Sequence, residues 1–144
     1  MPQALLTIGE LADRTGVATS ALRYYDEIGL VRPARRESGR RLYTSSAVGL
    51  VGVVLLLREV GFALGDIRRL LRSGSTGRVW RDLAAKKLED LDQQIAKAQV
   101  ARTAIEHSLA CPHDSILDCP TFWAVVASIL DNKPLAEADP HTCP

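Results

Sequence analysis

The spacing of apolar residues near the N-terminus predicts two short helices joined by a tight turn. The first covers residues 7–14, with Thr7 as the expected N-cap and Glu10, three residues later, completing a capping box. Residues 15–17 include a glycine and form the turn. The second helix runs from about Thr19 to Ile28, followed by a glycine in the C-cap place. This order is the helix-turn-helix pattern.

A polar hairpin and a very apolar helix come next. Residues 33–43 are rich in Arg, Glu, Ser and Gly and are flanked by apolar pairs at 30–31 and 42–43. This pattern predicts a two-stranded ribbon with a polar tip, called a wing. The following helix runs through Val60. Because its segment 48–57 is apolar on every side, we expect it to be buried in the core of the head domain.

A long helix carries an apolar seam in the second half of the chain. Residues 64–72 predict a short fourth helix, and the Ser- and Gly-rich segment 73–77 is the expected domain boundary. The long helix follows from about Val79 to Leu109. Its apolar residues step by threes and fours, at Ala84, Leu88, Leu91, Ile95, Ala98, Ile105 and Leu109. This is coiled-coil spacing, and a helix of about 45 Å cannot bury such a seam against so small a head. The pattern therefore predicts a dimer.

The end of the chain is predicted to contain a loop, a helix and a tail. Cysteines and prolines bracket the loop at 111–120, residues 121–130 form a short apolar helix, and residues 131–144 form a loose tail. The expected fold is therefore mainly α-helical, with three parts: a winged helix-turn-helix domain (1–73), a dimerisation helix (74–110), and an effector loop with a short helix and tail (111–144).

Composition and charge narrow the functional classes. Of the 144 residues, 47% are hydrophobic and 24% are charged, as in an ordinary globular protein. Residues 1–82 hold 13 Arg, no Lys and 8 acidic residues, whereas residues 83–144 hold 5 basic and 9 acidic ones. A basic first half suggests contact with a polyanion. No apolar run reaches membrane-span length, no secretory signal is visible, and three cysteines do not form a disulfide scaffold, so we expect a cytoplasmic protein without a membrane partner.

The second helix and the wing carry side chains suited to DNA. A helix in the major groove needs short polar groups at its N-terminal end and a long cation further along. This helix offers Thr19, Ser20, Arg23, Tyr24 and Tyr25. The wing offers Arg35, Arg36, Arg40 and Arg41. Arginine suits phosphate oxygens and narrow minor grooves. The helices alone could be a solvated hairpin, but together with the wing they favour binding to double-stranded DNA.

Three stretches of this sequence resemble the mercury-resistance regulator (MerR) family of bacterial transcription factors. They are Leu-Arg-Tyr-Tyr-Asp-Glu-Ile-Gly-Leu-Val at 22–31, the segment 35–43, and Glu-Val-Gly-Phe-Ala-Leu at 59–64. The resemblance is close over residues 5–72 and continues through the long helix in architecture. It implies a homodimer held by an antiparallel coiled coil and bound to promoters whose spacer is too long. Effector binding would then untwist and bend the DNA until RNA polymerase can use it.

The resemblance also assigns DNA contacts by position. The family's contacts fall on Arg23 and Tyr25 of the second helix and on Arg35, Arg41 and Tyr43 of the wing. Arg40 stands where many members have a tyrosine, which keeps the charge but changes one backbone contact. We therefore expect a DNA-binding surface made by the second helix and the wing.

The cysteine loop resembles the copper-sensing (CueR) branch of this family. It shares the pattern Cys-Pro-x-Asp-x-x-x-Asp-Cys-Pro, from Cys111 to Pro120. The thiolates of Cys111 and Cys119 can approach a soft monovalent ion from opposite sides, as Cu(I) prefers. Cu(I) or another soft metal ion is therefore the expected effector. Metal-sensing members carry Ser or Cys near the start of the dimer helix, where this chain has Val79 or Trp80, and the indole would either cap the site or fill it.

Other interpretations of the same cysteines stay open. They could form a reversible disulfide that senses oxidants, or they could be inert. They could also fix the loop beside an apolar pocket for an organic effector, made by Trp80, His113, Ile116 and Trp123. The histidines at 107, 113 and 141 could also join Cys111, Cys119 and Cys143 to build a zinc site, which is a further branch.

Two different functional classes compete with an effector-responsive regulator. One is a thiol oxidoreductase, but the C-x7-C spacing differs from C-x-x-C and the pair follows no strand, so we expect a protein that is not an enzyme. The other is an architectural DNA binder without an effector. An iron–sulfur cluster needs four close cysteines and is excluded.

Overall fold

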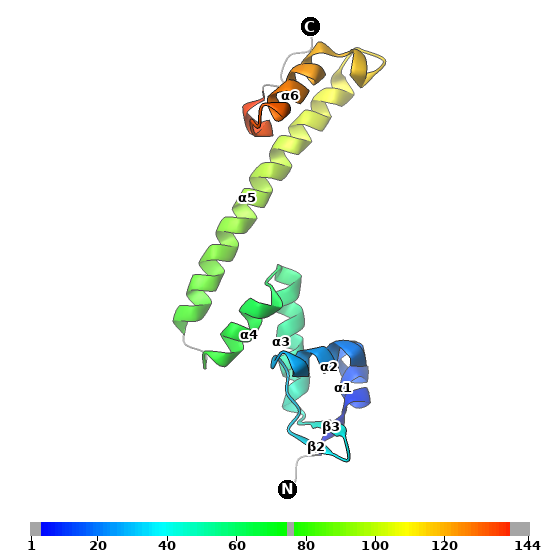
Figure 1. The fold of residues 1–144 in the computed structure, drawn as a ribbon, viewed down its shortest axis with the longest axis vertical. Helices are drawn as coiled ribbons and strands as arrows, with labels where there is room; N and C mark the ends of the chain where they lie inside the picture. Colours follow the sequence, from blue (N-terminus) through cyan, green and yellow to red (C-terminus); the bar gives the residue numbers. More distant parts are fainter. Residues whose placement is uncertain (1–3, 75–76, 139–144) are drawn as a thin grey trace. The chain divides into compact units, whose positions relative to one another are not determined.

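The computed structural model describes residues 4–74 and 77–138. The chain divides into two compact units, Met1–Ala84 and Ala85–Pro144. Helices dominate both units, and a small sheet belongs to the first (Figure 1). The fold class expected from the sequence is therefore confirmed. Within the described ranges, no helix is both long and apolar enough to cross a membrane.

The helix-turn-helix forms as the sequence predicts. Thr7 caps α1 (Ile8–Thr15): its hydroxyl accepts the backbone N–H of Glu10, and the Glu10 carboxylate accepts the backbone N–H of Thr7 at 2.7 Å. Two N–H groups that a helix start leaves unpaired are satisfied in this way. Gly16 ends α1 at φ +72°, a conformation that favours glycine. α2 (Thr19–Glu27) follows after two residues.

The two strands predicted for the wing pair with each other as expected, and a further short strand extends them into a three-stranded antiparallel sheet. The central strand is β3 (Arg40–Tyr43), with β2 (Arg35–Glu37) on one side and β1 (Leu6–Thr7) on the other. The sequence pattern misses β1 because two residues are too few to show an alternation. The apolar pair at 30–31, expected to flank the ribbon, is buried in the core outside any strand.

The core of the first unit lies between the helix-turn-helix, the sheet and two further helices. These are α3 (Ser46–Val60), which contacts α1, and α4 (Leu64–Arg72), which contacts α3. The largest fully buried side chains are Leu11, Leu22, Val31, Tyr43, Val51, Val54 and Ile67. Leu83, near the start of the next helix, also joins this core. The first unit therefore buries an apolar core of its own.

α3 is buried on one face only, so the expectation of burial on every side is wrong for the single chain. Its inward positions are spaced by three or four residues, at Ala47, Val51, Val54 and Leu57. Val53, Leu56 and Val60 are exposed on other sides of the helix. The physical reason is size, because so small a unit has too few elements to surround a helix.

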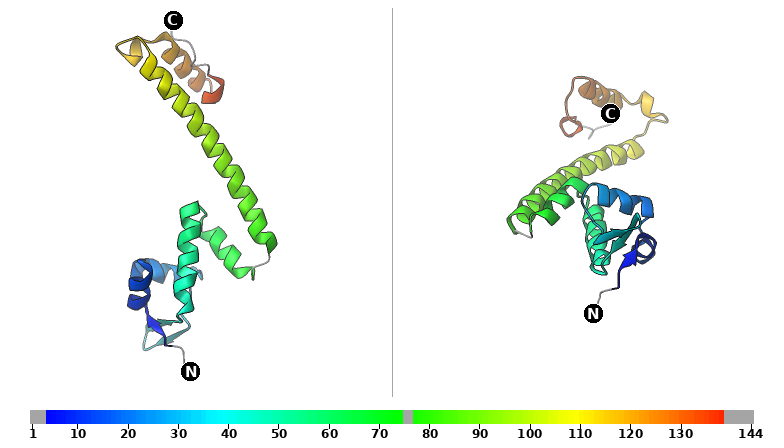
Figure 2. Two further views of the ribbon diagram at one scale, coloured as in Figure 1. Left: turned by 180° about the vertical axis from the view of Figure 1, so that it is seen from behind. Right: turned by 60° about the horizontal axis from the view of Figure 1, so that its bottom comes forward.

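The second unit is built on α5 (Gly77–Ala110), which begins within the first unit. After a short loop, α6 (Pro120–Leu130) turns back alongside the C-terminal end of α5, as different views show (Figures 1 and 2). The loop contains the 3-10 turn η1 (Ile116–Asp118), and the turn η2 (Leu135–Glu137) contacts α6. The tail is thus not wholly loose, although its last part, 139–144, lies outside the described residues.

The apolar seam of α5 is uncovered in the single chain. Leu88, Ile95, Ile105 and Leu109 are between 60% and 82% exposed. Among the described residues beyond Ala84, only two are buried, Cys119 and Ala138. Burying a side chain the size of Leu or Ile is worth about 1.5–3 kcal/mol. This exposure supports the coiled coil, which stays a prediction.

Candidate DNA interface and metal centre

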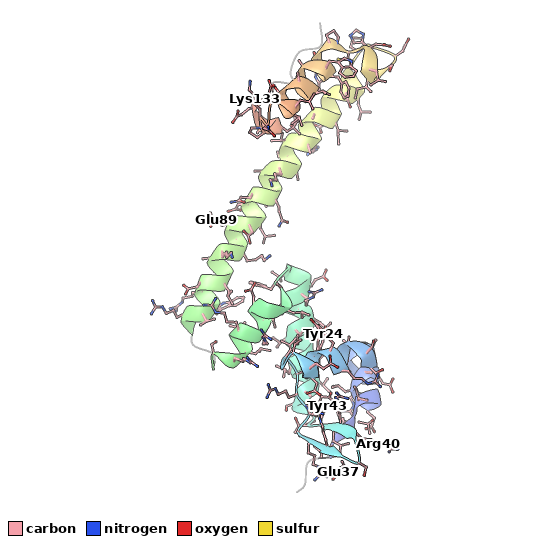
Figure 3. The ribbon with its side chains drawn as sticks, in the orientation of Figure 1. Tyr24, Glu37, Arg40, Tyr43, Glu89 and Lys133 are labelled. Atoms are coloured by element: carbon pink, nitrogen blue, oxygen red, sulfur yellow. The ribbon has the colours of Figure 1, made fainter. Side chains whose placement is uncertain are left out.

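α2 presents most of its predicted DNA-binding side chains at the surface. Ser20, Arg23 and Tyr24 are exposed, and Thr19 at the first turn is partly exposed. Figure 3 labels Tyr24 on this helix. Tyr25 faces the other way and is buried in the core. The exposed face therefore combines short hydroxyl groups at its N-terminal end with one guanidinium, as groove binding requires.

A single carboxylate of α2 holds two arginines of the wing. Asp26 Oδ2 accepts hydrogen bonds from Arg36 Nη2 at 2.6 Å and from Arg41 Nε at 2.7 Å. The side chain of Asp26 is only 7% exposed. The hydrogen bond that Arg41 donates to Asp26 is the main reason that the pKa of Arg41 is raised. The wing is thereby anchored to the helix beside it. The sequence analysis did not predict this role of Asp26. The one sequence feature that could have indicated it is an acidic residue on the helix that precedes an arginine-rich hairpin.

The rest of the wing remains at the surface. Arg35 and Glu37 form an ion pair of 2.8 Å, and Arg40 is exposed opposite Glu37 on the neighbouring strand. Figure 3 marks Glu37 and Arg40 on the wing. Arg40 is therefore exposed outside the described ion pairs, whereas Arg35 is exposed but paired with Glu37.

Tyr43 occupies a different position from the one that the resemblance implied. Its side chain is fully buried, and its hydroxyl has no hydrogen-bond partner among the described residues. Burial is also the largest cause of its raised pKa. With no exposed surface, Tyr43 cannot contact DNA in this conformation, so we place it in the core beneath the wing.

A groove lined by three arginines lies between the helix-turn-helix and the wing. It has a volume of about 370 Å³ and is lined by Thr7, Ile8, Arg23, Gly39, Arg40 and Arg41. Three arginines thus line one groove. Of these three, only Arg41 forms an ion pair among those described, and its partner is Asp26. The positive charge of these arginines makes the groove suited to an anion such as a phosphate group.

The cysteine loop in the second unit gathers three metal-ligating side chains. Cys111, His113 and Cys119 each offer one ligand atom, and these atoms all lie within 4.8 Å of one another. Cys119 is 3% exposed. The Nε2 atom of His113 is buried and has no hydrogen-bond partner among the described residues. Two sulfurs and an imidazole nitrogen are donors that thiophilic metal ions accept.

Local hydrogen bonds bring the second cysteine back beside the first. The hydroxyl of Ser115 accepts the N–H of Leu117, and the N–H of Cys119 donates to the carbonyl of Ile116 at 3.2 Å. The indole Nε1 of Trp123 donates to the carbonyl of Leu117 at 2.7 Å. Cys119 is the N-cap of α6, where the helix dipole favours a negative charge. The loop is thus a defined turn and not an open chain.

A small apolar cavity adjoins the two cysteines. Its volume is about 230 Å³, and it is lined by Ala104, Ile105, His107, Ser108, Cys111, Ile116, Cys119, Thr121, Phe122 and Val125. Of the four residues predicted for an effector pocket, only Ile116 lines it. Trp123 holds the loop, His113 joins the cysteines, and Trp80 packs against Phe62 in the first unit with ring centroids 5.8 Å apart.

The fold and the surface define a class, that of a winged helix-turn-helix DNA-binding protein. Residues 6–74 match the model of the MerR HTH family regulatory protein, and residues 50–108 match the model described as MerR, DNA binding. Over 121 residues the chain is 33% identical to the HTH-type transcriptional regulator HmrR of Rhizobium leguminosarum bv. viciae, covering 80% of this chain and 93% of that protein. The chain belongs to the MerR family of transcriptional regulators.

Two further comparisons extend this assignment. The mercuric resistance operon regulatory protein of Bacillus cereus is 33% identical over 120 residues, which is 78% of this chain and 91% of that protein. A cryo-EM structure of an EcmrR–DNA complex in EcmrR-RPo has a TM-score of 0.63 at 25% identity, covering 73% of this chain and 38% of that one. The relatives are transcription regulators and not enzymes, so the thiol oxidoreductase is excluded.

Proposed function

We propose that this DNA-binding regulator responds to a thiophilic metal ion bound by its cysteine loop. The observation that carries the proposal is the group of Cys111, His113 and Cys119, whose ligand atoms lie within 4.8 Å of one another. The Nε2 of His113 supports it, because this atom is buried without a hydrogen-bond partner among the described residues and a bound ion would supply one. The similarity to a mercuric resistance operon regulatory protein is a further support.

The adjoining cavity supports an organic effector less well than the three ligand atoms support a metal ion. Its volume of about 230 Å³ lies below the roughly 300–1,000 Å³ usual for ligand pockets. Its lining also includes both cysteines, so a ligand there would compete with a metal ion for the same side chains. A metal ion therefore fits this loop better than an organic molecule does.

At the DNA end, we propose that α2 enters the major groove and the wing contacts the backbone. Arg23 and Tyr24 of α2, with Arg35, Arg40 and Arg41 of the wing, form the proposed contact surface, and Thr19 and Ser20 lie at the start of the helix. The EcmrR–DNA complex supports this use of the fold. Asp26 accepts hydrogen bonds from Arg36 and Arg41, and we call this arrangement the clamp. The clamp would keep the wing in one orientation relative to α2, which lowers the entropy cost of binding DNA.

The regulator is proposed to act as a homodimer through the seam of α5. Leu109 belongs to this seam and precedes Cys111 by two residues, so the metal loop and the dimer helix are directly joined in the chain. We propose that effector binding alters the dimer through α5 and thereby changes the promoter DNA presented to RNA polymerase. The exposed seam and the family's architecture support this coupling.

Metal binding and oxidation of the cysteines can be separated by experiment. Reduced full-length protein is titrated without oxygen with Cu(I) and with Zn²⁺, each in competition with a chelator. We expect each chain to bind one equivalent of metal ion tightly. Substitution of Cys111→Ser or Cys119→Ser should abolish both tight binding and the transcriptional response and leave DNA binding intact, because a hydroxyl oxygen is a much poorer ligand for such ions.

The controls decide between the interpretations. Cys143→Ser, at the third cysteine of the chain, should keep both metal binding and the response. Hydrogen peroxide alone should produce no response. If neither ion binds tightly and the double serine variant still responds, the cysteines are not the sensor. A response to peroxide without metal would identify a thiol redox switch instead.

A further inference from the structure

The metal loop contains a nitrogen donor that a two-thiolate site does not need. His113 follows Cys111 by two residues, and one of its ring nitrogens lies within 4.8 Å of both cysteine sulfurs. Its Nε2 is buried and has no hydrogen-bond partner among the described residues. An unsatisfied buried polar atom is costly for a folded protein, and a bound metal ion would remove that cost.

We propose that His113 is a third metal ligand and that it makes the loop a site for a divalent cation of the zinc class in preference to Cu(I). The inference rests on the proposed function, that of a metal-responsive regulator, and it names the kind of ion. Two thiolates alone led to the expectation of Cu(I) or another soft metal ion, and the third ligand favours the zinc branch that the sequence left open.

The geometry of three donors favours zinc. Zn²⁺ binds sulfur at about 2.3 Å and nitrogen at about 2.0–2.1 Å, so ligand atoms at the corners of a tetrahedron lie roughly 3.5–3.8 Å apart. The three atoms of the loop, all within 4.8 Å, need to approach by only about 1 Å to reach this arrangement. Two sulfurs at this separation could bind Cu(I) linearly without the histidine, whereas a tetrahedral zinc site uses all three donors.

Charge balance points the same way. Two thiolates and a neutral imidazole carry a charge of −2, which a divalent cation neutralises and Cu(I) leaves at −1. Because Cys119 is 3% exposed, a residual charge there would be poorly solvated. The other charged residues of the loop, Asp114 and Asp118, are both acidic, and segment 111–120 contains no Lys or Arg. The N-terminus of α6 supplies only about half a positive charge.

The test compares two histidines of the same unit. His113 belongs to the group of ligands, whereas His107, whose Nε2 is also buried without a described partner, lines only the apolar cavity. Reduced full-length protein carrying His113→Ala or His107→Ala is titrated with Zn²⁺ against a chelator and, separately, with Cu(I). Co²⁺ is used as a spectroscopic probe, because its visible absorption reports tetrahedral coordination.

We expect His113→Ala to weaken Zn²⁺ binding at least ~100-fold, since even residues that only support a ligand change metal affinity by about 10–100-fold. The tetrahedral Co²⁺ spectrum should be lost, and Cu(I) binding should change by less than about tenfold because both thiolates remain. His107→Ala should match wild type with each ion. His113→Cys, which restores a third donor, should recover the binding of divalent ions and shows that the loop tolerates substitution.

Each other outcome identifies which statement fails. Zn²⁺ binding that is equal in wild type and His113→Ala overturns the third-ligand proposal. Tight Cu(I) binding with weak Zn²⁺ binding in wild type also overturns it and leaves the metal-responsive function standing. Absence of tight binding for every ion in wild type overturns the metal-responsive function itself.

Discussion

The two units of this chain bury apolar side chains to very different extents. Met1–Ala84 encloses a core in which Leu11, Leu22 and Tyr43 are completely buried. In Ala85–Pro144, Cys119 and Ala138 are the buried residues among those described, and the seam of α5 is exposed. A unit with its own core can fold by itself, whereas an apolar seam in water needs a partner. The contrast indicates that the head is self-sufficient and that the second unit depends on what it binds.

The largest expected effect is the loss of the dimer when a charge is placed in the seam. Ile95→Asp should weaken self-association by at least ~100-fold, because an unpaired buried charge costs about 3–5 kcal/mol. Gln93→Asp, on the opposite side of α5 by the helical period, is the matched control and should stay dimeric. Sedimentation at several concentrations measures both. A wild-type chain that is monomeric at micromolar concentration would contradict the proposed interface.

The next effect concerns the core of the head. Leu22 is completely buried, so Leu22→Ala should lower the free energy of unfolding by about 2–5 kcal/mol. Leu130 is exposed at the end of α6, and Leu130→Ala should change stability by less than about 0.5 kcal/mol. Denaturant unfolding followed by circular dichroism measures the difference. Equal effects of the two substitutions would mean that the head lacks the core seen in the structure.

DNA contacts should give a smaller but specific effect. The DNA for this test is a sequence selected for binding to the wild-type protein. Arg23→Ala and Arg41→Ala should each weaken binding to this DNA by about 1–3 kcal/mol, which is roughly 5–150-fold. Each substitution should also reduce the dependence of the DNA affinity on salt concentration. Lys133→Ala removes one exposed positive charge from the second unit and should leave both quantities unchanged. Fluorescence anisotropy at several salt concentrations measures them. Unchanged binding in both arginine variants would remove the proposed docking surface.

The smallest expected effect tests the position of Tyr43. Tyr43→Phe removes a buried hydroxyl without a described partner, so it should leave stability unchanged or raise it by up to about 1 kcal/mol. DNA affinity should stay within about twofold of wild type, because the side chain is not exposed. A large loss of DNA affinity would instead support the contact that the family resemblance implied.

The same substitution has a pH-dependent signature. Burial raises the pKa of Tyr43 above its ordinary value of 10.0, so folding favours the neutral hydroxyl. This contribution is fully present below that ordinary pKa and is lost as the pH rises through the higher pKa of the folded state. The wild-type head should therefore lose stability above about pH 10, and Tyr43→Phe should lose less. Unfolding measured from pH 8 to pH 11 gives the comparison.

Sequence reasoning succeeded where structure depends on neighbouring residues. The capping box at Thr7 and Glu10 and the extents of α3, α4 and α6 follow from caps, glycines and apolar spacing. These signals are local, because a helix start or end is specified within a few residues. The DNA-binding class followed from the same stretch of chain together with its arginines.

The features that were missed depend on residues brought together only by folding. β1 is a strand only because it pairs with β3, and Tyr43 is buried only because helices pack over the sheet. The clamp joins Asp26 of α2 to arginines of the wing that lie ten and fifteen residues further along. In the sequence, His113 is one of several possible metal ligands. Only the folded loop brings its ring close to both cysteine sulfurs. No periodicity in the sequence reports these contacts.

The most direct test of the account is native mass spectrometry of the full chain purified without chelator or reductant. We predict a dimer that carries one divalent metal ion per chain, the ion being absent from the Cys111→Ser/Cys119→Ser variant and strongly depleted in His113→Ala. The dimer should persist in those variants, because the seam of α5 does not require the metal. A wild-type chain that is monomeric and metal-free, or a dimer whose metal content is the same in all three proteins, would contradict the account.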